Sequence, residues 1–243
     1  MFTRPHIVNL GLSFCLLLFA EFSIAAAPEP FVVNYDARYR GLRAEATISL
    51  EQNENGSYLA HSIIAIKLFG ATVTSINERS RFDWIEDRPR PRHYEYIQRG
   101  LGSRSRSIDF NWQENTALAS VDERQTELEL PGLTLDELSM YTVLKQEVLD
   151  GAEDVFFDVI DRNQVEEYHY RLIGEEAVET EVGTFQALKV ERVRENSERL
   201  TQLWFAPEHD MLLIKIYHRD PDGDDYEITI KDAQLNGEAV TAG

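Results

Sequence analysis

Alternation of apolar and polar residues runs through several segments of the chain and strongly constrains its fold. Residues 44–51 read Ala-Glu-Ala-Thr-Ile-Ser-Leu-Glu, and residues 226–231 read Tyr-Glu-Ile-Thr-Ile-Lys. A period of two places one face of a strand in the core and the other in water. The Asn53-Glu54-Asn55-Gly56 stretch after the first segment is typical of a hairpin turn. The chain therefore predicts antiparallel β-structure.

Turn residues divide the rest of the sequence into further strand-length segments. Pro89 and Pro91 predict a break between two strands, and residues 161–163 and 222–224 have the composition of turns. A strand is expected at 211–220, and its residues 211–217 are apolar nearly throughout, which is typical of a strand buried on both faces. The other expected strands are 57–69, 72–86, 92–98, 104–110, 116–120, 123–130, 155–161, 165–173, 179–182, 186–195, 199–205 and 226–234.

One segment, residues 134–150, has a strong helical signature. Thr134 and Glu137 have the spacing of a capping box. In this motif the side chain of each residue accepts a hydrogen bond from the backbone N–H of the other. Asp150 and Gly151 mark the end of the segment. Apolar residues recur every three or four positions at Leu135, Leu138, Tyr141, Leu144 and Val148. The segment therefore predicts a single helix packed against the strands.

These elements predict a mainly β fold: a strongly curved antiparallel sheet, half-barrel or barrel, with one packed α-helix at about 134–150. No internal repeat or linker divides the sequence, so residues 28–243 are expected to form one β-rich domain. Residues 1–27 are assigned separately to an N-terminal signal helix.

The N-terminal segment has the order of a secretory signal peptide. A mildly basic start is followed by the apolar residues 7–19 and then by small residues. Cleavage is expected after Ala25 or Ala27, which would place the mature protein in the periplasm and leave association with the outer membrane open. A retained anchor or buried N-terminal helix is the alternative. Cys15 is the only cysteine, and the bulky Phe14 before it disfavours lipoprotein processing. The mature chain would therefore have no thiol or disulfide.

Charge and motifs exclude several functional classes. The net charge of −19 argues against nucleic acids and anionic lipid surfaces as general partners. No Gly-x-Ser-x-Gly motif, paired-histidine metal motif or phosphate loop occurs. The acidic residues 220–225 lack calcium-loop spacing and predict a solvated turn. We expect no catalytic residue, no cofactor and no metal, although a hydrolase site assembled only in space stays an alternative.

Two further features allow a binding role. Residues 99–106 form a basic cluster with two glycines, which fits a hairpin with solvated arginines or a site for an anionic partner. Aromatic residues also share strand faces, and such residues can line a cavity inside a curved sheet or belong to an ordinary core. The candidate cavity aromatics are Phe82, Trp84, Tyr94, Tyr96, Phe110, Trp112 and Trp204.

Several segments resemble one bacterial family. The block 182–194, which continues through 199–207 and 212–214, resembles the family catalogued as domain of unknown function 3108. Residues 35–42, 76–82 and 136–139 resemble it too, and the similarity covers roughly residues 31–235. The resemblance implies an exported, β-rich protein of the Gram-negative envelope, and it assigns no catalytic residues.

The leading functional hypothesis is a periplasmic, non-enzymatic binding or carrier module for a lipid or another apolar or amphipathic ligand. The first alternative is an envelope scaffold or accessory protein that binds another protein. The second is an unrecognised hydrolase. The sequence predicts no nucleic-acid partner and no transmembrane span in the mature chain.

Overall fold

The computed structural model describes residues 27–39, 42–195 and 197–242, most of which belong to one β-sheet. Residues 1–26 of the predicted signal peptide, including Cys15 and the cleavage position after Ala25, lie outside the described residues. The strands are β1 (Phe31–Tyr39), β2 (Leu42–Gln52), β3 (Tyr58–Leu68), β4 (Ala71–Ile85), β5 (Arg88–Gly100), β6 (Arg104–Asn111), β7 (Thr116–Val121), β8 (Arg124–Glu129), β9 (Thr134–Leu135), β10 (Asp154–Asp161), β11 (Gln164–Thr180), β12 (Gly183–Val193), β13 (Leu200–Ala206), β14 (Leu212–Arg219), β15 (Asp225–Leu235) and β16 (Glu238–Ala239).

The sheet consists of two meanders that meet at β1. The strand order is β8-β7-β6-β5-β4-β3-β2-β1-β15-β14-β13-β12-β11-β10-β9, and β16 pairs with β15. All neighbours are antiparallel except β9 and β10, which are parallel. The edge strands β8 and β9 do not pair with each other in this order, so the described sheet is open.

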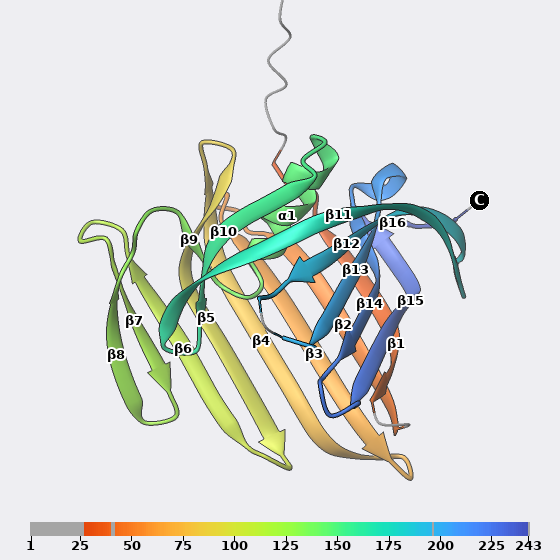
Figure 1. The fold of residues 1–243 in the computed structure, drawn as a ribbon, viewed down its shortest axis with the longest axis horizontal. Helices are drawn as coiled ribbons and strands as arrows, with labels where there is room; N and C mark the ends of the chain where they lie inside the picture. The colour runs from red at the N-terminus through yellow and green to blue at the C-terminus, as the bar shows by residue number, and fades with distance from the viewer. Residues whose placement is uncertain (1–26, 40–41, 196, 243) are drawn as a thin grey trace, which may run out of the picture.

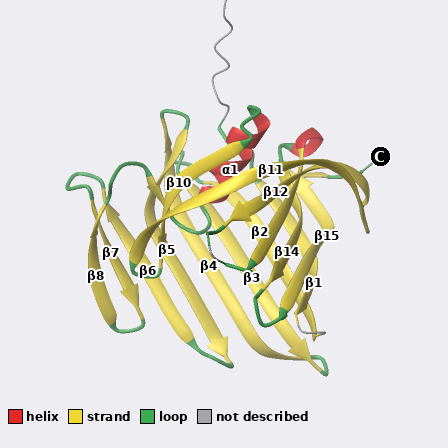
Figure 2. Cartoon of the chain, in the orientation of Figure 1, coloured by secondary structure: helices red, strands yellow, loops and turns green. Residues whose placement is uncertain are grey.

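The sheet curves strongly around one concave face. The helix α1 (Met140–Leu149) and the 3-10 helix η1 (Pro207–His209) lie at the same end of the molecule (Figures 1 and 2). The largest buried cluster joins Val143 and Leu144 of α1 to Tyr35, Val190 and Ile214 of the sheet. The predicted mainly β class, with a curved antiparallel sheet and one helix, is confirmed, and the sheet is not a closed barrel.

The two prolines lie within β5, so the predicted break at Pro89 and Pro91 is wrong. Pro91 pairs with Phe82 and Pro89 with Trp84 on β4. On the other side of β5, pairing with β6 begins only at His93. Both prolines therefore lie where the β6 side of β5 is not yet paired. A missing N–H on that side removes no hydrogen bond between strands. The actual β4–β5 turn is Glu86 and Asp87, both with positive φ.

The helix begins later than the sequence predicts, and the Thr134–Glu137 capping box does not form. Thr134 belongs to β9, and its hydroxyl donates to the Gly132 carbonyl at 3.2 Å. Asp136 Oδ1 instead accepts the backbone N–H groups of Leu138 and Ser139, each at 2.9 Å. A carboxylate is a stronger acceptor than a hydroxyl, so Asp136 organises the turn that precedes α1.

The structure joins two predicted strands and adds three that the sequence analysis did not predict. Residues 165–173 and 179–180 belong to one long strand, β11, whose register shifts between Leu172 and Gly174, and residues 181–182 form the turn after it. That bulge interrupts the alternation and produced the apparent gap in the pattern. The additional strands are β1, β9 and β16.

Candidate ligand-binding groove

The concave face contains an open groove with a volume of about 660 Å³. Its floor comes from β2, β3 and β4, where the alternating pattern places every second residue on the concave side. Ala44 pairs with Ile66 and Ala46 with Ile64, so small side chains on β2 lie beside branched ones on β3. Ala37 on the neighbouring strand β1 pairs with Ala44, and these two small side chains leave space in the groove.

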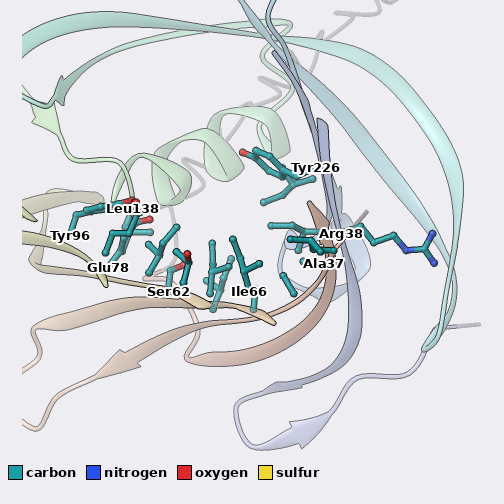
Figure 3. Close-up of a pocket in the computed structure, with 18 of the residues that line it drawn as sticks. Ala37, Arg38, Ser62, Ile66, Glu78, Tyr96, Leu138 and Tyr226 are labelled. Atoms are coloured by element: carbon teal, nitrogen blue, oxygen red, sulfur yellow. The ribbon is translucent and has the colours of Figure 1, made fainter. Parts of the chain in front are cut away.

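The opposite walls of the groove come from α1, its preceding turn and the C-terminal strands. Leu138 and Tyr141 line one side, and Ile216, Tyr226 and Ile228 line another. Figure 3 shows Ser62 and Ile66 on the sheet side of the space, with Leu138 and Tyr226 facing them across it. The lining is therefore mainly apolar and is contributed by residues distant in sequence.

The inner end of the groove is polar. Tyr94 OH lies 3.0 Å from Glu78 Oε2 and 3.0 Å from Glu137 Oε2. A phenol has one proton to donate, so both contacts are hydrogen bonds only if one carboxyl is itself protonated. Burial, reinforced by the charge of Glu137, raises the pKa of Glu78 to about 7. Glu78 can therefore hold that proton near neutral pH and present a polar carboxyl to the groove.

One arginine partly compensates this acidic end. The guanidinium of Arg106 lies 3.6 Å from Glu137 Oε2 and 4.0 Å from Asp161 Oδ1. It also stacks over the Tyr96 ring, 4.6 Å from the centroid. The positive charge of Arg106 therefore compensates Glu137 more directly than it compensates Glu78. Because Glu78 gains less from this charge, its protonated form stays favourable.

A second polar group borders the groove at Thr201. His218 Nδ1 lies 2.8 Å from Thr201 Oγ1, and His218 Nε2 lies 3.5 Å from Asp220 Oδ1. The His218 ring also stacks on Tyr226, with centroids 4.9 Å apart. Burial lowers the pKa of His218, so the imidazole is neutral at neutral pH and able to accept a proton.

The outer end of the groove is its mouth, at the turn ends of β3–β4 and β5–β6. Val73, Leu101 and Arg104 line it. Arg38 borders the space, but its guanidinium points away from it (Figure 3). Glu78 is the carboxyl group among the described lining residues.

Of the seven aromatics proposed from the sequence, Tyr96 lines the groove. Phe82 is fully buried and stacks on Tyr58 with centroids 5.4 Å apart, and Trp84 contacts the same ring edge-on at 6.4 Å. Tyr94 is buried behind the groove wall and contributes its hydroxyl to the acidic end.

The remaining three aromatics lie away from the groove. Phe110 and Trp112 stack at 5.8 Å and pack against the separate cluster around Tyr94 and Tyr96. Trp204 is 4% exposed and belongs to the main core.

The sequence analysis missed the residues that form most of the groove. The alternation at 44–51 marked Ala44 and Ala46 as inward-facing, but their small size, which creates the space, was not used. Glu78 was also missed, although it interrupts the inward series of Ile76, Ser80 and Phe82 with an acid. A carboxyl on the dry face of a strand is a readable signal.

Two further properties of the described residues bear on other functions. No group of three or more histidine, cysteine, aspartate or glutamate side chains in the described part of the chain is arranged to hold a metal ion. None of the helices within residues 27–242 that the structure describes is long and apolar enough to cross a membrane.

Two solved structures resemble this chain to different extents. A β-barrel-like protein of domain of unknown function DUF1849 from Brucella abortus superimposes with a TM-score of 0.59 at 7% identity, covering 86% of this chain and 99% of that one. A protein assigned as exported, with a YmcC-like fold, from Bacteroides fragilis gives a TM-score of 0.35 at 9% identity, covering 88% and 96%. The first similarity supports the fold alone. No curated protein matches the chain.

The sequence comparison gives a family. The model of the protein family of unknown function DUF3108 matches residues 34–231, from the first strand to the last long one. This span includes the floor, the walls and the acidic end of the groove. The chain therefore belongs to the DUF3108 family.

Proposed function

We propose that the protein is a non-enzymatic periplasmic carrier for an apolar or amphipathic ligand. The groove of about 660 Å³ carries this proposal, because it is mainly apolar and open to solvent. Its volume lies within the roughly 300–1,000 Å³ of ligand-binding pockets. The N-terminal basic, apolar and small-residue order supports the periplasmic location.

The polar end gives the ligand a preferred orientation. Apolar chain atoms fit against Ala44, Ile64 and Ile66, whereas a head group that forms hydrogen bonds fits at Glu78. A protonated Glu78 can donate a hydrogen bond and an ionised one can only accept. An amphipathic molecule with one polar end matches this division better than a wholly apolar one.

Native mass spectrometry tests the proposal. The protein is secreted to the periplasm, purified without detergent, and measured intact, and bound material is then extracted with organic solvent. We expect a discrete adduct whose extract contains an apolar or amphipathic molecule. A bare protein mass, both as purified and after incubation with fatty acids and phospholipids, would contradict the proposal.

A hydrolase is a second candidate, favoured by the Thr201–His218–Asp220 contacts beside the groove. Two features weigh against it: Asp220 is 3.5 Å from the imidazole, and it already accepts a hydrogen bond from Arg199 at 2.7 Å. If the protein is a hydrolase, it should cleave fatty-acyl nitrophenyl esters, and Thr201→Val should abolish this cleavage. If it is a carrier, the unmodified protein should show no such cleavage, and the variant should keep the ligand adduct.

Binding of another protein through a sheet edge has weaker support. The edge strand β8 pairs only with β7 in the described sheet, which leaves one side free. Arg124, Glu127 and Glu129 are exposed on this strand, and charged edges of this kind discourage strand addition. The carrier function is therefore the one that we favour.

A further inference from the structure

Beside the groove mouth, two hairpins expose apolar side chains to solvent. Phe69 in the β3–β4 turn is 101% exposed, Leu68 before it is 40% exposed, and Leu101 in the β5–β6 turn is 73% exposed. The two turns lie at the same end of the sheet, because Gly100 pairs with Thr74 and the Leu101 N–H donates to the Val73 carbonyl at 3.3 Å (Figure 1). Leu101 also lines the groove.

Phe69 occupies a position that disfavours it in the isolated protein. It forms a two-residue turn with Gly70, and both have positive φ, 50° and 84°. Left-handed backbone is costly for a bulky residue and suits asparagine, aspartate or glycine. The β7–β8 and β15–β16 turns place Asp122 and Asn236 in this conformation, and the β10–β11 turn places the charged, hydrophilic Arg162 there. Folding alone therefore does not explain a fully exposed phenylalanine here.

The β5–β6 turn holds Leu101 in place. Gln98 Nε2 donates to the Leu101 carbonyl at 2.9 Å, and Ser103 Oγ donates to the Gly100 carbonyl at 2.9 Å. A turn restrained in this way loses little conformational entropy when its apolar side chain is buried by a partner.

The charge around these turns is opposite to that of the whole chain. Residues 67–77 and 96–108 contain one lysine, three arginines and no acidic residue, in a chain of net charge −19. Lys67 pairs with Glu45 on β2 at 2.6 Å, so the arginines supply the uncompensated charge. Arg38, Arg43, Arg99 and Arg104 are exposed at this end of the sheet, and none of them forms a salt bridge with a described residue.

Acidic residues also lie at this end of the sheet. The β14–β15 turn, residues 220–225, lies close to the end of β1, where Arg38 pairs with Glu227. In the β7–β8 turn, Asp122 Oδ1 accepts the Ser105 N–H at 3.0 Å. The basic charge is therefore local to the β3–β4 and β5–β6 turns.

We propose that Phe69, Leu68 and Leu101, together with Arg38, Arg43, Arg99 and Arg104, form a rim that docks on an anionic lipid bilayer. Exposed apolar tips enter the interfacial region, and the arginines contact the lipid phosphates. This orientation places the groove mouth against the bilayer, so an amphipathic ligand can pass between membrane and groove. The passage of ligand rests on the proposed carrier function, whereas the docking does not.

Vesicle flotation tests the docking. The purified, processed protein is mixed with vesicles of phosphatidylcholine, with or without phosphatidylglycerol. We expect it to float only with the anionic vesicles. Phe69→Asn should weaken this binding at least about tenfold, because a buried phenylalanine contributes roughly 1.5–3 kcal/mol. Asparagine suits the left-handed turn, so lost binding cannot be attributed to misfolding.

The charge contribution has its own variant and control. Arg99→Gln with Arg104→Gln should weaken binding about fivefold for each arginine removed, since each contributes roughly 1 kcal/mol at an anionic surface. Phe156→Asn on β10 is the matched control, because Phe156 is also exposed, at 55%, but lies away from the rim. It should bind like the unmodified protein.

Three results would overturn the docking: no flotation of the unmodified protein, Phe69→Asn that floats equally well, or Phe156→Asn that loses binding to the same extent. Failure of the carrier function is separately visible. Phe69→Asn should keep the ligand adduct in native mass spectrometry, whereas a variant that fills the groove should lose the adduct and still float.

Discussion

Trp204 shows why a single residue was difficult to assign from sequence. On β13 it is compatible with either a core position or a cavity wall, and the structure places it in the core with 4% exposure. Its indole Nε1 donates to Glu176 Oε1, and the ammonium groups of Lys189 and Lys215 lie 4.9 and 5.2 Å from its ring centroid. The polar covering comes from β11, β12 and β14, so no local pattern encodes it.

We expect Trp204→Ala to lower the free energy of unfolding by about 3–5 kcal/mol, because it leaves a cavity in a packed cluster. Urea denaturation measures the change, and Trp204→Phe, which retains an aromatic ring, should lose less. A shift in melting temperature below about 1 °C for the alanine variant would show that the side chain is not buried.

The hairpin between β5 and β6 depends on a backbone approach at Gly100. Its φ is +88°, and a Cβ atom built there would lie 2.1 Å from the Val73 carbonyl oxygen on β4. The backbone of Val73 cannot move as readily as the end of a side chain. A side chain at position 100 would therefore push β5 away from β4.

Gly100→Ala should therefore destabilise the protein more than a substitution that carries conformational strain alone. Gly56→Ala is the control, because Gly56 has φ of +82° and nothing within 4 Å of the added Cβ. We expect Gly56→Ala to lower the free energy of unfolding by about 1 kcal/mol and Gly100→Ala to lower it clearly more, as measured by thermal unfolding. Equal losses would contradict the close approach.

Elements with a regular local pattern were predictable, and those defined by tertiary contacts were not. The alternation at 44–51 and the turn at 53–56 correspond to β2 and the β2–β3 turn. The start of α1 was wrong because Asp136 binds Ser80 Oγ, 2.6 Å away and 56 residues earlier in the chain. The groove likewise depends on Ala37 meeting Ala44 and Ile228, a register that no single segment contains.

The stability of the whole fold should depend on the proton of Glu78. Burial raises its pKa from 4.5 to about 7 in the folded protein, where it faces Tyr94, Glu137, Asp136 and Arg106. The folded state then binds more protons than the unfolded state between these values. Glu78 therefore contributes its full stabilisation of the folded state below about pH 4.5. This contribution is lost as the pH rises through about 7.

Glu78→Gln removes this dependence while keeping the side-chain shape. We expect the variant to be more stable than the unmodified protein by roughly 1–3 kcal/mol at about pH 8, and the difference to shrink towards about pH 4. Urea denaturation at both pH values measures it, with the exposed Glu127→Gln on β8 as control. A variant that is less stable at high pH would show instead that the ionised carboxylate stabilises the fold.

At the scale of the whole molecule, the central claim is that an amphipathic ligand binds in the groove on the concave face. The most direct test compares Ala44→Phe, which fills the groove, with Ala65→Phe on the opposite face of the adjacent strand. Both variants and the unmodified protein are titrated with a fluorescent fatty acid, after thermal unfolding has shown that they remain folded. We predict that Ala44→Phe weakens binding at least about tenfold, a loss of roughly 1.4 kcal/mol, and that Ala65→Phe does not change it. Equal affinities in all three proteins would show that the ligand does not occupy the groove.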